Sequence, residues 1–220
     1  MNRTVSWFCK IFLKPIVDTF LIKEVRGLEN IPKGNFILVS NHQSHLDWIA
    51  SGYLCVPKKF TFLGQVDRYT GPLGFGRDLL YLVAGVIRIN RKDEESKKIA
   101  LEKAIEAIKK NGHSLVIYPE GTRSRTGEIQ KGRTGAVKIY LKTGVPILPA
   151  AIKGTFELFP PGGKLKIKRK VKINIGKPLH FGKERERVKN LDCNSLEYQN
   201  VLEEITEKIM TEIVRLYNEI

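Results

Sequence analysis

The sequence predicts an α/β fold in which a mostly parallel, mixed sheet is flanked by helices. Short apolar segments at 36–39, 60–63, 86–90, 115–118 and 147–152 have the length and composition of buried strands. Segments with helical periodicity alternate with them, and this alternation is typical of parallel strands covered on both faces. Polar motifs directly follow two of the strands, which is where open α/β sheets carry their sites.

The helices are expected between the strands and at the end of the chain. They are predicted at 47–54, 75–83, 94–110, 135–142 and 196–220. The third helix is expected to bury four apolar residues, Ile99, Leu101, Ile105 and Ile108. The last carries an apolar stripe at helical spacing, formed by Leu202, Ile205, Ile209, Ile213, Leu216 and Ile220. No repeat or low-complexity linker divides residues 25–220, so we expect them to form one α/β domain.

Residues 1–24 are the most apolar part of the chain and are expected to be helical. Lys10, Lys14 and Asp18 recur at helical spacing and form a narrow polar stripe, and Pro15 is expected to kink or divide the helix. A wide apolar face with Trp and Phe, edged by lysine, predicts an amphipathic membrane-anchoring segment that lies in a bilayer interface. The three charges exclude a membrane-spanning helix. A core-packing helix or a dimer contact is the alternative interpretation.

The formal net charge of +15 predicts an anionic partner: nucleic acid, an anionic membrane surface, or an acidic protein or substrate. Lysines occupy every even position from 164 to 172, and a strand there would present them in a row on one face. Such a row either protects an exposed sheet edge or docks phospholipid headgroups or an acidic carrier protein. No aromatic residue lies between these lysines, so we expect no nucleic-acid partner.

Three scattered cysteines, Cys9, Cys55 and Cys193, form no Cys-x-x-Cys pair and indicate reduced thiols in a cytosolic setting. Together with the apolar segment at 1–24, they predict peripheral or monotopic attachment to the cytoplasmic face of the cell membrane.

A histidine and an aspartate follow the predicted strand at 36–39. His42 and Asp47 are five residues apart, a spacing that on one continuous helix would separate them by about 140° around its axis. They meet only if the chain turns sharply after the strand and Asp47 lies near the start of the next helix. Neutral His42 can then take a proton from an alcohol, while Asp47 fixes the tautomer and stabilises the imidazolium.

Two other chemistries use the same residue types. Ser44 is close, but the sequence has no Gly-x-Ser-x-Gly elbow, so direct attack by a substrate alcohol is favoured over an acyl-enzyme. His42, His45 and Asp47 carry metal-binding atoms, but no further histidine-rich segment accompanies them. We therefore expect no metal and no cofactor.

A second polar motif, at 120–124, follows the predicted strand at 115–118. Gly121 provides a turn, and Arg123 offers a planar fork for phosphate oxygens. Glu120 is expected to fix an arginine or bind a substrate hydroxyl.

Further basic residues are expected near the same edge of the sheet. Arg91 follows the strand at 86–90. Lys131 precedes the helix at 135–142, whose first N–H groups and positive dipole end favour anions. These groups predict an anion site next to His42 and Asp47.

Four blocks of this sequence resemble the motifs of the glycerolipid acyltransferase family, and in particular those of bacterial 1-acyl-sn-glycerol-3-phosphate acyltransferases. Residues 41–47 resemble the His-x4-Asp motif, and residues 85–91, 120–124 and 145–150 are similar to the second, third and fourth motifs. The blocks occur in the family's order, and the overall length extends the resemblance over nearly the whole chain.

The resemblance implies a role for each matching residue. His42 would be the general base, assisted by Asp47, and Arg91 and Arg123 would engage the acceptor phosphate. Residues 145–150 would form a wall of the acyl-chain pocket. Glu120 and Gly121 would shape the acceptor site, and Asn41 and Thr122 of the same blocks are also expected to bind substrate. Lys131 lies outside the four blocks and is expected to bind substrate because of its place before the helix at 135–142.

The activity implied by the resemblance is acyl transfer from acyl-CoA or acyl carrier protein to the sn-2 hydroxyl of lysophosphatidic acid. The expected partners are this lysolipid or a related one, the acyl donor, and an anionic membrane surface. Acylation of glycerol 3-phosphate or another lysolipid is the nearest alternative. A basic nucleic-acid-binding protein and a metal-dependent phosphohydrolase are more distant ones.

Overall fold

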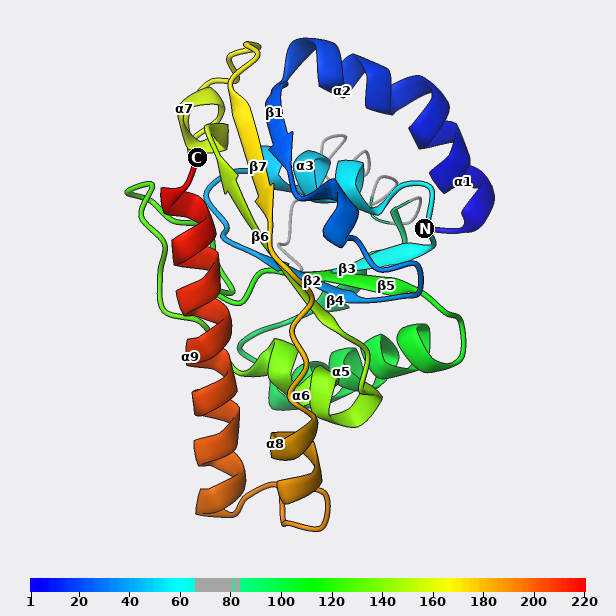
Figure 1. Ribbon diagram of the computed structural model, residues 1–220, viewed down its shortest axis with the longest axis vertical. Helices are drawn as coiled ribbons and strands as arrows, with labels where there is room; N and C mark the ends of the chain where they lie inside the picture. Colours follow the sequence, from blue (N-terminus) through cyan, green and yellow to red (C-terminus); the bar gives the residue numbers. More distant parts are fainter. Residues whose placement is uncertain (66–80, 82–83) are drawn as a thin grey trace.

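The computed structural model describes residues 1–65, 81 and 84–220. These residues form a seven-stranded sheet in the order β1-β7-β6-β2-β5-β3-β4, covered by helices (Figure 1). Neighbouring strands are parallel except β6 and β7, which are antiparallel, so the predicted mixed, mostly parallel α/β sheet is confirmed. The strands are β1 (Ile22–Arg26), β2 (Ile37–Ser40), β3 (Phe60–Gln65), β4 (Ile87–Ile89), β5 (Ser114–Ile117), β6 (Ile147–Lys153) and β7 (Val171–Ile175).

The central strands are buried on both faces. All four residues of β2 and of β5 are buried, as expected for continuous apolar runs in a parallel sheet. Side chains alternate between two apolar clusters. Leu38 and Val116 pack with α3 (Leu46–Cys55) on one face. Ile37 and Leu115 pack on the other face with α5 (Glu94–Lys109), α6 (Gly135–Thr143) and α9 (Leu196–Asn218).

The helices predicted at 47–54, 94–110, 135–142 and 196–220 are present, with one difference in packing. Two short helices at 155–158 and 182–187 were not predicted, and β1 begins within the segment that was expected to be helical. In α5, Ile99 is 42% exposed, and the buried residues besides Ile108 are three alanines: Ala100, Ala104 and Ala107. Small side chains let α5 approach its neighbours closely, so the inward face follows the alanines and not Ile99. The predicted helix at 75–83 lies largely outside the described residues. In the described part of the domain the helices are η2 (Leu28–Asn30), α3 (Leu46–Cys55), α5 (Glu94–Lys109), α6 (Gly135–Thr143), α7 (Thr155–Leu158), α8 (Gly182–Arg187) and α9 (Leu196–Asn218).

The last helix, α9, buries the predicted stripe except for Ile220, which lies beyond the helix end. It packs mainly on β6 and against α6.

The N-terminal segment is a divided helix, as the position of Pro15 predicts. It consists of α1 (Arg3–Phe8), a π-helical turn η1 (Cys9–Leu13) and α2 (Lys14–Phe20). Pro15 lies in the first turn of α2, where its missing N–H group is tolerated. β1 spans residue 24, so the chain enters the sheet across the boundary expected between the segment and the domain. Among the described residues, no helix combines the length and the apolarity needed to cross a bilayer.

The polar stripe of α2 faces the protein, and the apolar face of the segment faces outward. The Tyr53 hydroxyl donates to the Asp18 carboxylate at 2.7 Å, and the Lys14 ammonium lies 4.1 Å from the centre of the Tyr53 ring. Burial and the Asp18 carboxylate raise the pKa of Tyr53. Seven apolar side chains are 41–57% exposed: Trp7, Phe8, Ile11, Phe12, Leu13, Ile16 and Phe20. We call these seven residues the apolar face; a helix that packs into the core would bury them.

The predicted strand over residues 164–172 is wrong for most of its length. β7 begins only at Val171, and the residues before it lie outside the sheet. The reason is the lack of a ladder partner: β6 ends at Lys153, which pairs with Lys172, and Gly154 then turns the chain away with a φ of 93°. An alternating pattern forms a strand only where a neighbouring strand supplies the hydrogen bonds.

Candidate active site

The candidate site lies where β2 and β5 end. The two strands are parallel neighbours, with Val39 beside Ile117, so the segments that follow them emerge side by side. The first segment, 41–45, turns sharply and enters α3. Its first residue, Asn41, is fully buried and forms two 2.8 Å hydrogen bonds with the backbone N–H and C=O of Ile152. Asn41 therefore fastens this turn to β6 through both ends of its amide group.

His42 and Asp47 form the predicted pair. The distance between His42 Nδ1 and Asp47 Oδ2 is 2.9 Å, and the same carboxylate oxygen accepts the backbone N–H groups of Gln43 at 2.7 Å and Ser44 at 2.8 Å. Asp47 is fully buried in the first turn of α3, as the sequence argument requires. Because Nδ1–H donates to Asp47, Nε2 is the ring nitrogen that can accept a proton.

Tyr118 is a part of the site that the sequence analysis did not identify. Its ring stacks on the His42 ring with centroids 4.0 Å apart and planes 10° apart. Its hydroxyl hydrogen-bonds Ser51 at 3.1 Å, and burial raises its pKa well above the usual value, so it remains neutral. The only signal in the sequence is its place directly before the motif at 120–124. Tyr118 and Asp47 together fix the plane of the imidazole.

Glu120 connects two backbone segments of the site. Its two carboxylate oxygens accept backbone N–H groups, from His42 at 2.7 Å and from Gln130 at 3.0 Å. Burial raises its pKa to about 7, and the two backbone donors only partly oppose this shift. Glu120 thus joins the two segments that carry His42 and Arg123, a role reinforced by a 2.8 Å bond from Ser124 N–H to the His42 carbonyl.

Gly121 makes the predicted turn. Its φ is 73°, and its N–H donates to the Tyr118 carbonyl at 3.0 Å. A Cβ at this position would lie 3.1 Å from the side chain of Arg133. The turn therefore favours glycine for two reasons: its φ is positive, and Arg133 leaves little room for a side chain.

A cavity of about 230 Å³ joins the predicted chemical groups. Its wall includes His42, Arg91, Thr122 and Arg123, so the structure brings the base and the two predicted phosphate ligands to one space. His45, Trp48, Gln65 and Tyr118 also line it. Lys131 is exposed and lines neither this cavity nor the one beside it, within the part of the chain that the structure describes.

The adjacent cavity, of about 440 Å³, has a more apolar wall and shares Leu63, Arg91 and Tyr118 with the first. Its apolar side chains come from β3, β4, β5, α5 and α6, and the N-terminus of α6 and Arg133 also border it. Residues 145–150, which the resemblance assigns to an acyl-chain pocket, lie instead at and in β6, and none of them lines this cavity. They form core because β6 is buried between β7 and β2.

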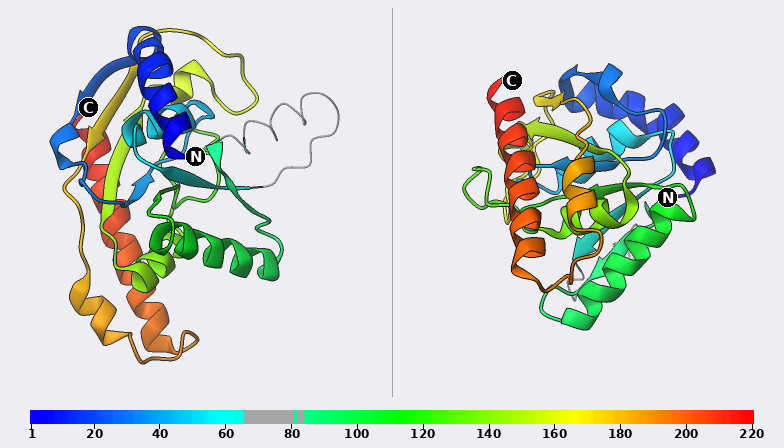
Figure 2. Two further views of the ribbon diagram at one scale, coloured as in Figure 1. Left: turned by 90° about the vertical axis from the view of Figure 1, so that its right-hand side faces the viewer. Right: turned by 60° about the horizontal axis from the view of Figure 1, so that its bottom comes forward.

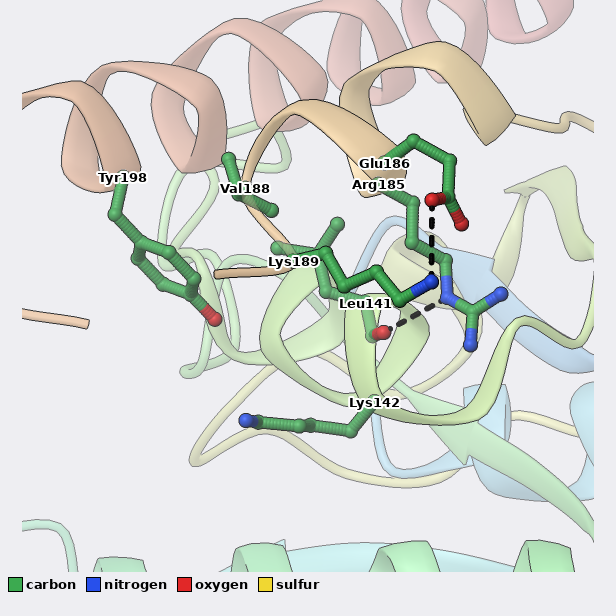
Figure 3. A pocket seen from close by; sticks show the side chains of 7 residues that line it. All are labelled: Leu141, Lys142, Arg185, Glu186, Val188, Lys189 and Tyr198. Carbon is green, nitrogen blue, oxygen red and sulfur yellow. Dashed lines mark hydrogen bonds and ion pairs between the residues drawn. The ribbon is translucent and has the colours of Figure 1, made fainter. Parts of the chain in front are cut away.

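A third cavity, of about 310 Å³, lies between α6, α8 and α9 (Figure 3). Arg185 Nε donates to the Leu141 carbonyl at 2.9 Å at the end of α6, and Lys189 pairs with Glu186 at 3.4 Å. The Arg185 bond ties α8 to α6, the Lys189–Glu186 pair is local to α8, and the lining contains no acid–base pair like His42 and Asp47.

No group of three or more His, Cys, Asp or Glu side chains is arranged to hold a metal ion within residues 1–65, 81 and 84–220. The Asp47 oxygen nearest His42 is occupied by one ring and two backbone donors.

Comparison with known proteins connects this geometry to one family. The family description "Acyltransferase" matches residues 23–153. The chain is 30% identical over 181 residues to the chloroplastic 1-acyl-sn-glycerol-3-phosphate acyltransferase BAT2 of Brassica napus. This match covers 80% of this chain and 51% of the relative. It is 35% identical over 136 residues to the 1-acyl-sn-glycerol-3-phosphate acyltransferase of Borreliella burgdorferi, covering 61% of this chain and 52% of that one. The chain thus spans about half the length of these relatives.

A solved structure is also similar. The 1-acyl-sn-glycerophosphate acyltransferase PlsC from Thermotoga maritima superposes with a TM-score of 0.62 at 27% identity, over 94% of this chain and 79% of that one.

Proposed function

Because the chain belongs to the acyltransferase family, we propose that it transfers an acyl chain from an acyl thioester to the sn-2 hydroxyl of lysophosphatidic acid. The product would be phosphatidic acid, and the donor is carried on coenzyme A or on acyl carrier protein. The relatives that are named 1-acyl-sn-glycerol-3-phosphate acyltransferase support this acceptor.

The observation that carries the proposal is the cavity shared by His42, Arg91 and Arg123. A base alone fits many reactions, and an arginine pair alone fits any anion. A base held by Asp47 at 2.9 Å, on the same wall as two guanidinium groups, fits an alcohol that also carries a phosphate.

In the proposed reaction, His42 Nε2 removes the hydroxyl proton as the alcohol oxygen attacks the thioester carbonyl. The carbon–sulfur bond then breaks, and the imidazolium returns its proton to the leaving thiolate. Asp47 holds the tautomer and stabilises the imidazolium between these two steps. Arg91 and Arg123 hold the phosphate, so that the two reactants meet in one orientation. The apolar cavity beside the site has a wall suited to the acyl chain.

We also propose that the protein attaches peripherally or monotopically to the cytoplasmic face of the cell membrane. What supports this is the apolar face, because its seven exposed side chains include Trp and Phe, while Lys14 and Asp18 of the same segment face the domain. An acceptor with its tail in the leaflet could then reach the site with its headgroup.

The function is tested by offering lysophosphatidic acid and labelled acyl-CoA or acyl carrier protein to the wild type and to His42→Ala, and separating the lipids. We expect His42→Ala to lower the rate of phosphatidic acid formation by roughly 10²- to 10⁴-fold, the usual range for loss of a general base. His180→Ala, which removes an exposed histidine far along the chain, is the matched control and should retain full activity.

Equal rates for the wild type and His42→Ala would refute the assignment of the base. Glycerol 3-phosphate is offered as a second acceptor to test the nearest alternative. If the enzyme acylates it in preference to lysophosphatidic acid, the proposed acceptor is wrong, but the acyl-transfer mechanism stands. Phosphate release that a chelator abolishes would favour a phosphohydrolase.

A further inference from the structure

A strongly basic surface segment remains unused by the proposed chemistry. Residues 163–170, which we call the basic loop, connect α7 to β7 and are all exposed. Leu165 is 51% and Ile167 is 70% exposed, and each stands between two lysines. Lys164, Lys166 and Lys168 have no carboxylate within ion-pair distance in the described part of the chain, whereas Lys170 pairs with Glu157 at 3.5 Å.

Protection of a sheet edge does not explain these lysines. The basic loop lies outside the sheet, and β7, which follows it, is an inner strand paired with β1 on one side and β6 on the other. Lysines prevent aggregation where a strand has free N–H and C=O groups, and the loop presents no such strand. Another cause is needed for three cations around two exposed aliphatic side chains.

One end of the basic loop is fastened to the end of the apolar face. The N–H groups of Lys170 and Val171 both donate to the Leu21 carbonyl, at 3.0 and 2.9 Å. Arg169 Nε donates to the Ile22 carbonyl at 2.7 Å. Leu21 directly follows Phe20, which is 55% exposed. Figures 1 and 2 show the loop before β7 at the same end of the molecule as α2.

The segment that leads from α7 into the basic loop begins beside the candidate site, at Phe159. Ser44 Oγ donates to the Phe159 carbonyl at 2.7 Å, and the rings of His45 and Phe159 lie 5.7 Å apart. The Lys166 N–H returns to the Leu158 carbonyl at 2.8 Å, which fixes how the loop leaves α7. The connection from α7 to β7, which contains the basic loop, therefore runs from the His45 side of the cavity to the end of the apolar face.

We propose that the basic loop is a second membrane contact, in which Lys164, Lys166 and Lys168 bind anionic phospholipid headgroups while Leu165 and Ile167 enter the interface. Alternating cations and aliphatic side chains suit a surface that is anionic outside and apolar below. Because the basic loop is fastened to the end of the apolar face, both can contact the same bilayer surface. The inference rests on the proposed function, because it assigns the loop the task of holding the cavity at the leaflet that contains the acceptor.

The test is sedimentation of the full chain with phosphatidylcholine vesicles that contain or lack phosphatidylglycerol. One variant removes three charges of the loop, by Lys164→Gln, Lys166→Gln and Lys168→Gln. It should bind the phosphatidylglycerol vesicles roughly 10- to 100-fold more weakly than the wild type, and its binding should depend less on salt. The double variant Leu165→Ser and Ile167→Ser should weaken binding to both kinds of vesicle, by about tenfold.

The matched control removes three exposed lysines from α5 and α8, by Lys103→Gln, Lys109→Gln and Lys183→Gln. This control changes the net charge by the same amount as the loop variant. If both triple variants lost the same vesicle affinity, the proposal would be overturned. Unchanged vesicle binding by the loop variants, with a raised KM for acyl carrier protein but not for acyl-CoA, would assign the loop to the carrier protein and also overturn it.

Activity on detergent-dispersed lysophosphatidic acid separates this proposal from the proposed function. We expect the loop variants to match the wild-type kcat there, because no membrane has to be reached. A wild type that acylates no lysolipid but still shows the loop-dependent vesicle binding would refute the function and leave the membrane contact standing.

Discussion

At the scale of single residues, two buried carboxylates next to His42 perform different tasks. Asp47 contacts the imidazole itself and accepts two further backbone N–H groups, so it sets the tautomer. Glu120 contacts only backbone, and it holds the turn of His42 to the segment of Gln130. Both are acidic residues beside a motif in the sequence, and only their partners distinguish them.

Glu120 should make stability depend on pH. Its folded pKa, about 7, is higher than the ordinary 4.5, so the folded state binds more protons between these values. The free energy of unfolding should therefore fall as pH rises from 4.5 to 7, by up to roughly 3 kcal/mol, and stay level above that window. Urea unfolding of the wild type and Glu120→Gln across this pH range measures the effect.

The Glu120→Gln variant has no titratable group at this position. The difference between the two curves of unfolding free energy against pH therefore gives the contribution of the Glu120 carboxyl. Parallel curves for the two proteins would show that Glu120 titrates normally in the folded state.

At the scale of elements, the connection from β5 to α6 builds half of the site. Gly121 turns the chain, Thr122 and Arg123 reach the cavity of His42, and Arg133 packs beside the turn. A 2.8 Å bond from Arg133 N–H to the Pro119 carbonyl closes this connection on itself. The long segment between two regular elements is therefore held by its own contacts and by Glu120.

Arg123→Lys should test whether this connection presents a phosphate ligand. Lysine keeps the charge but loses the planar fork that binds two phosphate oxygens, so we expect KM for lysophosphatidic acid to rise about tenfold with little change in kcat. Arg125→Lys, an exposed arginine in the same connection that does not line the cavity, is the control. A fall in kcat at unchanged KM would instead place Arg123 in the chemical step.

At the scale of the whole molecule, the N-terminal helices reverse the usual amphipathic arrangement. Lys14 and Asp18 are engaged by Tyr53 on α3, and the apolar face points away from the domain. Burial lowers the pKa of Lys14, consistent with its inward position. The apolar face therefore gives the molecule one side rich in exposed apolar side chains.

Phe12→Ser together with Ile16→Ser should weaken binding to phospholipid vesicles by roughly 10- to 100-fold, since each side chain would lose its place in the bilayer interface. These side chains are 56% and 54% exposed, so the thermal unfolding midpoint should change little. Ile99→Ser with Leu196→Ser, two exposed aliphatic residues elsewhere, is the matched control. Unchanged vesicle binding, with loss of a dimer in gel filtration, would assign the apolar face to a protein contact.

Much of the fold could be predicted because each strand and helix carries its own local pattern. The strands at 36–39 and 115–118 are apolar throughout, which is the pattern of central parallel strands. The segment at 164–172 was predicted incorrectly because its alternation is also local, whereas a strand needs a neighbour that β6 no longer supplies after Lys153. The inward face of α5 was missed at Ile99 because alanines can approach the sheet more closely.

The sequence by itself determined the central strands, the helices α3, α5, α6 and α9, the His42–Asp47 pair and the arginines that accompany it, since these follow from composition and short spacings. It did not determine β1, α7 or α8. Only the tertiary structure decided that Asn41 binds Ile152, that Glu120 holds two backbone segments, and that Tyr118 stacks on His42. It also decided that the apolar face points outward. Periodicity shows which residues share a face, but what that face meets depends on contacts between residues far apart in the chain.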